Sequence, residues 1–350
     1  MPPPTKGAVG EVVGDNLYIA CGNVCRLVKP NTNDLYKLDL NTWIWHKLEP
    51  RGTKPLESCF MASWVRGEKI FIFGGAVSGE EVGAGYPDAL DIVDCYSNQL
   101  VYYDTQINSW HWPTSSGKVP PPRAHHAVSY VEREYKGLGP LAFVFGGYGR
   151  IFQFDGYYGK YYNDLFYLDM DTMKWEAVHA NTDAISSEMW PKARKGHSLT
   201  AISSETAVLF GGSFDYGTSF GDCWLLNIGE CTSKGKVEDI WTKCTKKELE
   251  GLCRTFHEAV REPNSGRVWI IGGCEGNNFD NFNLVNSEKT ILCADHVREI
   301  AFSAPPLKVL ALESAANNYE KLVPAIMELP DSSTLRLSVV GKARRKYLIT

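Results

Sequence analysis

A histidine that follows an arginine by three positions occurs three times in this chain and is the first candidate for chemistry. The three elements are Pro122-Arg123-Ala124-His125-His126, Ala193-Arg194-Lys195-Gly196-His197 and Cys253-Arg254-Thr255-Phe256-His257. Imidazole nitrogens are common metal ligands, so His126, His197 and His257 could together hold an ion. We favour a structural role, because equivalent positions of separate repeats in a ring lie too far apart to share one ion. We therefore predict no metal site and no cofactor, and expect each histidine to hydrogen-bond local backbone.

A second candidate is peptide binding by the residues that vary between these copies. The two residues between arginine and histidine differ in every copy, and the residues after nearby Gly-Gly pairs are expected on the same face. Segment 148–161, which follows the Gly-Gly pair at 146–147, is rich in tyrosine and glycine. We predict that it is a long loop, which either binds a ligand or is solvated. Aromatic side chains beside cations can anchor a peptide and hold a carboxylate. The predicted peptide-binding residues are His125, Tyr148, Arg150, Lys160, Lys195, Phe214 and Phe256.

These residues must be positioned by a repeating element, and the sequence contains one. A short apolar run that ends in Gly-Gly recurs four times, at 70–75, 142–147, 207–212 and 268–273, with a weaker copy at 17–23. Such runs are typical of strands buried on both faces. The two glycines permit positive φ and close backbone approach where the chain leaves the strand.

A second element follows three of these copies with constant spacing. Asn33, Asn98 and Asn163 each precede an aspartate by six residues and a tryptophan by twelve. Alternating side chains indicate a strand, the aspartate favours a turn, and the tryptophan is expected to pack each unit against its neighbour. Each unit is thus predicted to contain four short strands, and several units must stack to bury their faces.

Composition and charge narrow the function further. The 350 residues include 36 Lys+Arg and 41 Asp+Glu, for a net charge of −5, which argues against a generally basic nucleic-acid-binding surface. Apolar runs are too short for a membrane span. The ten cysteines lack the close pairs of a zinc site and are expected to be reduced, in the cytoplasm or nucleus. No catalytic motif of the common hydrolase, nucleotide-binding or zinc-protease types is present, so we predict no catalytic residues and no enzyme activity.

The Gly-Gly, Asn-Asp-Leu and Asp-x-x-Thr-x-x-Trp elements, in that order, resemble the kelch repeat. The resemblance covers about residues 8–300 and implies an all-β fold, a kelch β-propeller with five repeats detected and six blades possible. The segment 197–204, together with Leu310-Ala311-Leu312-Glu313, is similar to the kelch domain-containing protein 2 group of substrate receptors of cullin–RING ubiquitin ligases. That resemblance implies binding of a substrate's C-terminal peptide, a degron, on the top face of the propeller.

The C-terminal part of the chain changes periodicity. Apolar residues at three-to-four spacing predict an amphipathic helix within a helical segment at 304–340, followed by a basic tail at 341–350. By the same resemblance, this segment is a box that docks elongin B/C and a cullin through Leu312, Ala316, Tyr319 and Leu322. The alternative is a kelch scaffold that binds cytoskeletal or signalling proteins without ligase coupling, in which this helix would brace the propeller.

Overall fold

A computed structural model describes fourteen stretches of the chain. They are residues 1–24, 31–78, 90, 92–93, 95–132, 138–153, 156–179, 188–214, 218–233, 235–245, 249, 251–262, 267–274 and 297–301. The chain divides into two compact units, residues 1–259 with 271–297, and residues 260–270 with 298–350. Within the described residues, no helix is long and apolar enough to cross a membrane. The predicted helical segment 304–340 and tail 341–350 lie outside the described residues.

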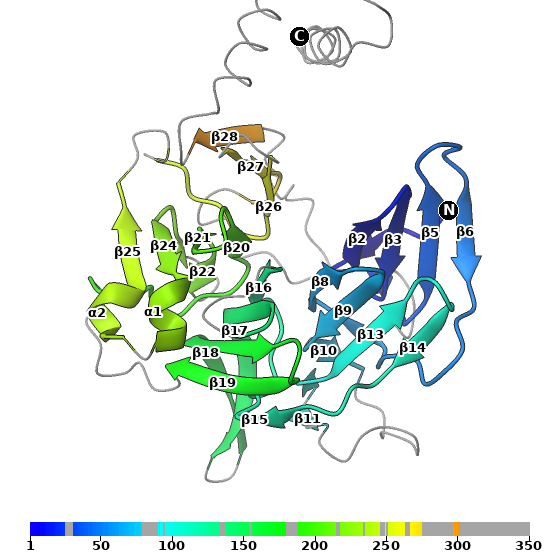
Figure 1. Cartoon of the computed structure of the whole chain (residues 1–350), viewed down its shortest axis with the longest axis horizontal. Helices are drawn as coiled ribbons and strands as arrows, with labels where there is room; N and C mark the ends of the chain where they lie inside the picture. The colour runs from blue at the N-terminus through cyan, green and yellow to red at the C-terminus, as the bar shows by residue number, and fades with distance from the viewer. Residues whose placement is uncertain are drawn as a thin grey trace, which may run out of the picture. The chain divides into compact units, whose positions relative to one another are not determined.

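The first unit is all-β and consists of repeated antiparallel sheets, as predicted (Figure 1). Each large sheet begins with an inner strand and proceeds outward along the chain. The first sheet contains β2 (Val9–Val13), β3 (Asn16–Ala20), β5 (Leu35–Asp39) and β6 (Trp45–Leu48). The second contains β8 (Ala62–Arg66), β9 (Lys69–Phe73), β13 (Leu100–Asp104) and β14 (Ser109–His111). We call these sheets blades 1 and 2.

Blades 3 and 4 follow the same order. Blade 3 contains β16 (Ala127–Val131), β17 (Leu141–Gln153), β18 (Gly156–Asp169), β19 (Lys174–His179) and, parallel to β19, β15 (Ser116–Gly117). Blade 4 contains β20 (Ser198–Ala201), β21 (Thr206–Phe210), β24 (Cys223–Asn227) and β25 (Trp241–Cys244). A further three-stranded sheet joins β26 (Glu258–Arg261), β27 (Arg267–Ile271) and β28 (Val297–Ala301), and most of its residues belong to the second unit.

Short strands occur in two places. Some lie just before an inner strand, and others lie in the segment that follows a Gly-Gly pair. They are β1 (Thr5–Lys6) with β4 (Asn23–Val24), β7 (Ser58–Cys59) with β10 (Ala76–Val77), β12 (Tyr96–Ser97) and β11 (Ile92–Val93), and β22 (Ser213–Phe214) with β23 (Thr218–Ser219). The glycines adopt the expected positive φ, for example +65° at Gly146 and +98° at Gly147. A Cβ on Gly146 would lie 2.9 Å from the carbonyl oxygen of Arg194, so only glycine permits this close approach between blades.

The predicted long loop at 148–161 is wrong, because this segment forms the outer half of a β-hairpin. β17 and β18 continue in register beyond the other strands of blade 3, from Tyr148 opposite Tyr161 to Gln153 opposite Gly156. Tyrosine and phenylalanine favour strands, and pairing with the neighbouring strand outweighs the interrupting glycines. We call residues 148–153 and 156–161 the arm; Figure 1 shows it projecting past the end of the blade.

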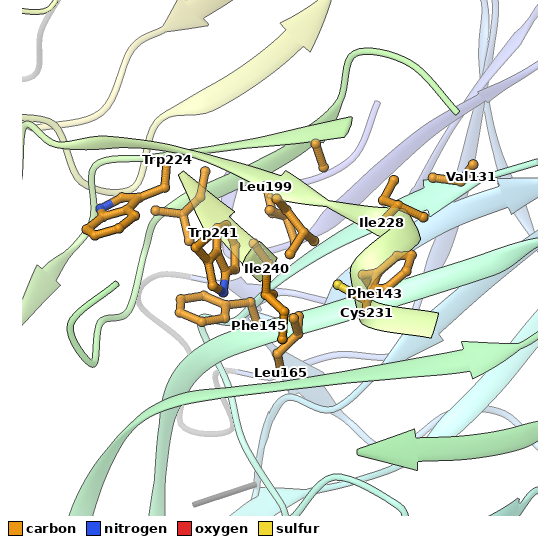
Figure 2. Packing of buried hydrophobic residues seen from close by; sticks show 14 of the residues in the cluster. Val131, Phe143, Phe145, Leu165, Leu199, Trp224, Ile228, Cys231, Ile240 and Trp241 are labelled. Atoms are coloured by element: carbon orange, nitrogen blue, oxygen red, sulfur yellow. The ribbon is translucent and has the colours of Figure 1, made fainter. Parts of the chain in front are cut away.

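Blade 4 contains two short helices that the sequence pattern did not reveal. α1 (Ile228–Ser233) and α2 (Val237–Ile240) connect β24 to β25, where the other blades have a tight turn. Figure 2 shows Ile228 and Cys231 of α1 beside Phe143 of blade 3. The helices therefore cover an interface between two blades.

Two tryptophans pack blade against blade, which confirms for Trp175 the packing predicted from the repeated motif. Trp175 of blade 3 is fully buried with its ring 5.0 Å from that of Phe73 in blade 2. The ring of Trp241 in blade 4 lies beside that of Phe145 in blade 3 (Figure 2), and their ring centres are 5.2 Å apart. Large buried aromatic rings supply much of the apolar area that a short-stranded sheet needs.

Candidate functional site

All three arginines of the repeated element are buried, and two of them, Arg123 and Arg194, bind an aspartate of their own blade, whereas Arg254 donates to the carbonyl oxygen of Gly272 at 3.0 Å. Arg123 donates to both carboxylate oxygens of Asp164 at 2.6 and 2.8 Å and to the carbonyl oxygen of Gly146 at 2.9 Å. Arg194 repeats this geometry with Asp222, at 2.6 and 2.8 Å. Two-pronged pairing satisfies a charge that burial would otherwise penalise. The pairs hold the start of the inner strand against the Gly-Gly turn.

Blade 2 replaces this ion pair with neutral residues. Ser58 stands at the arginine position and Gln99 at the aspartate position, and the two side chains hydrogen-bond at 3.0 Å. Gln99 also donates to the carbonyl oxygen of Gly74 at 3.0 Å, the equivalent of the bond that Arg123 makes to Gly146. The same backbone group is thus satisfied by two different chemistries within one chain.

The three repeated histidines are buried between blades. The rings of His126, His197 and His257 meet Phe73, Phe145 and Phe210 of the preceding blade edge-on, at 5.4, 5.5 and 5.3 Å. His197 Nε2 lies 3.1 Å from the carbonyl oxygen of Phe145, and His257 Nε2 lies 2.8 Å from Ser198 Oγ. Both hydrogen bonds therefore reach the neighbouring blade. The expectation that these histidines hydrogen-bond local backbone was wrong. In the part of the chain described, no group of three or more His, Cys, Asp or Glu could hold a metal ion.

Burial governs the charge state of these histidines. Burial, with a smaller contribution from the adjacent Arg194 and Arg254, lowers the pKa of His197 to about 3 and that of His257 to about 4. The pKa of His126 is also well below its usual range, because of burial and then of Arg123. All three side chains are therefore neutral and structural at physiological pH.

A chain of backbone hydrogen bonds links one residue from each of five successive repeats. Phe60 N donates to Gly7 O at 2.7 Å, His125 N to Phe60 O at 2.9 Å, Gly196 N to His125 O at 2.9 Å and Phe256 N to Gly196 O at 2.7 Å. All five residues have φ between 57° and 64°. We call Gly7, Phe60, His125, Gly196 and Phe256 the axial residues. They show that the repeats converge at one place, where the variable positions predicted from sequence meet.

Three aromatic rings fill the space at the axial residues. The ring of His125 lies 4.0 Å from that of Phe60 and 5.3 Å from that of Phe256. The two axial glycines make room for them, since a Cβ on Gly196 would lie 2.7 Å from the Phe256 ring and one on Gly7 would lie 2.4 Å from the Phe60 ring. The result is an aromatic floor that is partly exposed.

The residue before each axial residue pairs with the residue after a Gly-Gly turn. The five pairs are Lys6 with Asn23, Cys59 with Ala76, Ala124 with Tyr148, Lys195 with Ser213 and Thr255 with Cys274. This confirms that the two variable sets share one face. Most of these side chains are small, so the two lysines and Tyr148 dominate its chemistry.

Lys195 lies among aromatic rings at this face. Its ammonium nitrogen is 5.3 Å from the ring centre of Tyr148 and 5.4 Å from that of Tyr161, and the residue is only 9% exposed. Tyr161 also lies 4.8 Å from Tyr148 and 4.8 Å from Phe214. Aromatic faces stabilise a partly desolvated cation without neutralising it. Lys195 therefore places a cation beside Tyr148 and Tyr161 on this face.

The electrostatics of His125 agree with a positive site. Burial and, to a smaller extent, the charges of Lys195 and Lys6 together lower its pKa to about 3. His125 is therefore neutral, and it can act as a polar aromatic surface but not as a cation. The positive charge of this face comes from the lysines.

The structure brings together five of the seven predicted peptide-binding residues, which are His125, Tyr148, Lys195, Phe214 and Phe256. Arg150 is exposed and lies on the arm, on the same face as Tyr148. Lys160 is exposed on the opposite face of the arm, since it pairs with Gly149 in the register. The predicted docking residues Leu312, Ala316, Tyr319 and Leu322 lie outside the described residues.

Sequence reasoning missed Lys6, Phe60 and Tyr161 at this site. Phe60 occupies the position of His125 in a repeat whose arginine and histidine are replaced by Ser58 and Met61, which hides the motif. Tyr161 is found only through its strand pairing with Tyr148. The signal for Lys6 was the weak first repeat, whose Gly22 corresponds to the second glycine of the later pairs.

Comparison with known proteins agrees with this architecture. The KLHDC2/KLHL20/DRC7 Kelch-repeats domain matches residues 1–187 and 137–290. The chain is 26% identical over 334 residues to Kelch domain-containing protein 2 of Bos taurus, covering 92% of this chain and 74% of that protein. It is 29% identical over 244 residues to Kelch domain-containing protein 1 of Mus musculus, covering 65% of this chain and 54% of that protein.

A third relative, Host cell factor 2 of Homo sapiens, is 26% identical over 252 residues, or 69% of this chain and 27% of that protein. The chain thus spans about half of the second relative and about a quarter of the third. The repeats with their Gly-Gly turns, the stacked antiparallel sheets and the family match lead to one assignment. This chain is a kelch-repeat β-propeller protein of the KLHDC2/KLHL20/DRC7 family, a protein-interaction module.

Proposed function

We propose that this protein is a non-enzymatic substrate receptor of a ubiquitin ligase, and that its propeller binds the C-terminal peptides of substrates. The observation that carries the proposal is Lys195, a nearly buried cation surrounded by Tyr148 and Tyr161 beside the aromatic floor. A terminal carboxylate is the peptide group that best complements a desolvated ammonium ion. The floor of Phe60, His125 and Phe256 would contact the last side chain of the peptide.

A peptide-binding measurement tests this role. We expect Lys195→Met to weaken binding about tenfold, or ~1.4 kcal/mol, because the apolar stem is retained while the charge is removed. The probe is a fluorescent pool of ten-residue peptides with randomised last two residues and a free C-terminus, read by fluorescence anisotropy. The matched control is Lys192→Met, which removes an exposed lysine three positions earlier.

Amidation of the C-terminus separates carboxylate recognition from general attraction to lysine. The amidated pool should bind the wild type as weakly as the free pool binds the Lys195→Met variant. Equal binding of free and amidated pools would show that the C-terminus is not the recognised group.

The ligase role additionally requires an adaptor, which we propose is elongin B/C with a cullin, docked through segment 304–340. This part of the proposal rests on the sequence pattern around Leu312 and Leu322. We place the activity in the cytoplasm or nucleus, since none of the eight cysteines in the described residues forms a disulfide.

A pulldown from cell extract tests the adaptor. We expect elongin B/C and a cullin to co-purify with the wild type and to be lost from a Leu312→Asp, Leu322→Asp variant, because charges would disrupt an apolar docking face. Lys195→Met is the control and should retain the adaptor. Failure to recover the adaptor with the wild type, beside a known receptor that recovers it, would leave a kelch scaffold without ligase coupling.

A further inference from the structure

The arm has two chemically different faces. Paired residues on antiparallel strands share a face, and successive residues alternate. One face carries Tyr148, Arg150, Phe152, Tyr157, Gly159 and Tyr161, and the other carries Gly149, Ile151, Gln153, Gly156, Tyr158 and Lys160. We call them the front and back faces. The ring contacts Tyr148–Tyr161 at 4.8 Å and Phe152–Tyr157 at 5.2 Å confirm that each pair shares a face.

The front face is continuous with the site at the axial residues. Its inner end is the Tyr148–Tyr161 pair, which borders Lys195 and, through Tyr161, Phe214. Its outer end is the Phe152–Tyr157 pair, whose members are 64% and 51% exposed. Arg150 lies between the two pairs, opposite Gly159, and the side chain of Tyr148 fills the place that a Cβ on Gly159 would occupy. The front face is therefore an aromatic strip with one cation in its middle.

The charge of the arm indicates what would bind there. In the sequence, segment 148–161 contains Arg150, Lys160 and one acidic residue, Asp155, so its net charge is positive although the whole chain is net negative. Large exposed aromatic side chains on a rigid element are unusual unless they serve recognition. An acidic peptide segment with aromatic or large apolar side chains complements both properties.

The dimensions suit an extended peptide. Arg150 lies two residues beyond Tyr148 on β17 and Phe152 lies four beyond, which corresponds to roughly 7 and 13 Å along a strand. A peptide that ran outward from Lys195 would therefore bring about its third residue from the end to Arg150 and about its fifth to the Phe152–Tyr157 pair.

We propose that the front face of the arm binds the segment preceding a substrate's C-terminus, and that it selects acidic and aromatic residues there. This inference rests on the proposed function for the position of the C-terminus, and it adds the class of substrate. The receptor would thus read two features, a free carboxylate at Lys195 and an acidic, aromatic segment along the arm.

Peptide pools that differ upstream of the C-terminus test the inference. The ten-residue pools again have randomised last two residues, and the four residues before them are Phe-Phe-Glu-Glu in one pool and Ser-Ser-Lys-Lys in the other, so that the third residue from the end is acidic and the fifth is aromatic only in the first pool. We expect the wild type to bind the acidic–aromatic pool at least about tenfold more tightly. Arg150→Glu should remove most of that preference. The double variant Phe152→Ser, Tyr157→Ser should bind the acidic–aromatic pool about tenfold more weakly and should bind the other pool as the wild type does.

The back face supplies matched controls. Lys160→Glu makes the same charge change as Arg150→Glu, and Tyr158→Ser removes an aromatic side chain that is 49% exposed. Both should leave the preference unchanged, and equal melting temperatures would show that all variants fold. If back-face and front-face variants lower binding equally, general charge attraction explains the result and the inference is overturned.

The two proposals can fail separately. Sensitivity to amidation with no difference between the upstream pools would overturn the arm inference and support C-terminal recognition. A difference between the pools without sensitivity to amidation would support the arm and overturn C-terminal recognition. No binding of any pool overturns both. A wild-type dimer, measured by light scattering, that the Phe152→Ser, Tyr157→Ser double variant converts to a monomer would overturn the arm inference alone.

Discussion

Asp164→Ala will destabilise the protein by about 3–5 kcal/mol, because it leaves a fully buried arginine without its partner. Arg123 is 0% exposed and its guanidinium group also lies 4.1 Å from the ring of Tyr162, so no water can replace the carboxylate. The measurement is urea unfolding followed by tryptophan fluorescence. The loss is large relative to the 5–15 kcal/mol stability typical of folded domains.

The chain itself contains the compensating variant. Blade 2 satisfies the same backbone carbonyl with Gln99 and Ser58, so Arg123→Ser combined with Asp164→Gln should recover most of the loss, to within about 1–2 kcal/mol of the wild type. One difference between the blades limits the recovery. Gln99 also accepts a hydrogen bond from Leu56 N at 3.0 Å, whereas the equivalent Pro121 has no N–H to donate.

The cycle distinguishes two explanations for the conserved geometry of blades 3 and 4. If Asp164→Ala strongly lowers the free energy of unfolding and the double variant lowers it little, the ion pair is one of two interchangeable ways to hold the turn. The instability of Asp164→Ala then comes from the unpaired buried charge of Arg123. If the single variant costs less than about 1 kcal/mol, the arginine finds another partner and the pairing does not fix the repeat.

The repeating frame of this fold was predictable because its signals are local. Apolar runs ending in Gly-Gly predict β9, β17, β21 and β27, which the structure places at the expected positions. The tryptophan twelve residues after an asparagine predicts blade packing, which Trp175 confirms. Each signal depends only on strand periodicity and on the positive φ that glycine permits.

The departures from that frame were not predictable because they depend on pairing or on small insertions. The arm contains Gly149, Gly156 and Gly159, which suggest a loop until the register of β17 with β18 is known. The six residues of α1 and four of α2 are too short to show helical periodicity. The site was partly predictable, since His125, Lys195 and Phe256 vary within a repeat, but the contact of Lys195 with Tyr161 joins two blades.

Acidification will unfold this protein well above the pH at which its carboxylates titrate, because three buried histidines must remain neutral. The pKa values of His126, His197 and His257 are lower in the folded state than the ordinary value of 6.5. Below pH 6.5 the unfolded chain therefore binds more protons than the folded chain, and stability decreases as the pH falls.

The expected loss is large. Each fully shifted histidine costs about 2 kcal/mol between pH 7.5 and pH 5, so the three histidines between blades together cost about 6 kcal/mol, and His125, whose pKa is also lowered, adds to the loss. Glu11 and Glu258 act in the opposite direction, because burial raises their pKa values and the folded state then binds protons more readily. Their effect is smaller, since only two groups are involved and a hydrogen bond from Ser63 limits the shift of Glu11.

Met61 provides the variant that tests the cause. It occupies the histidine position in blade 2, so His126→Met places a side chain that the fold already accepts at an equivalent site. We expect urea unfolding at pH 7.5 to change little and the slope of stability against pH between 6 and 5 to decrease by about one proton, or ~1.4 kcal/mol per pH unit. An unchanged slope would mean that other groups cause the acid sensitivity, and that His126 accepts a proton within the folded propeller.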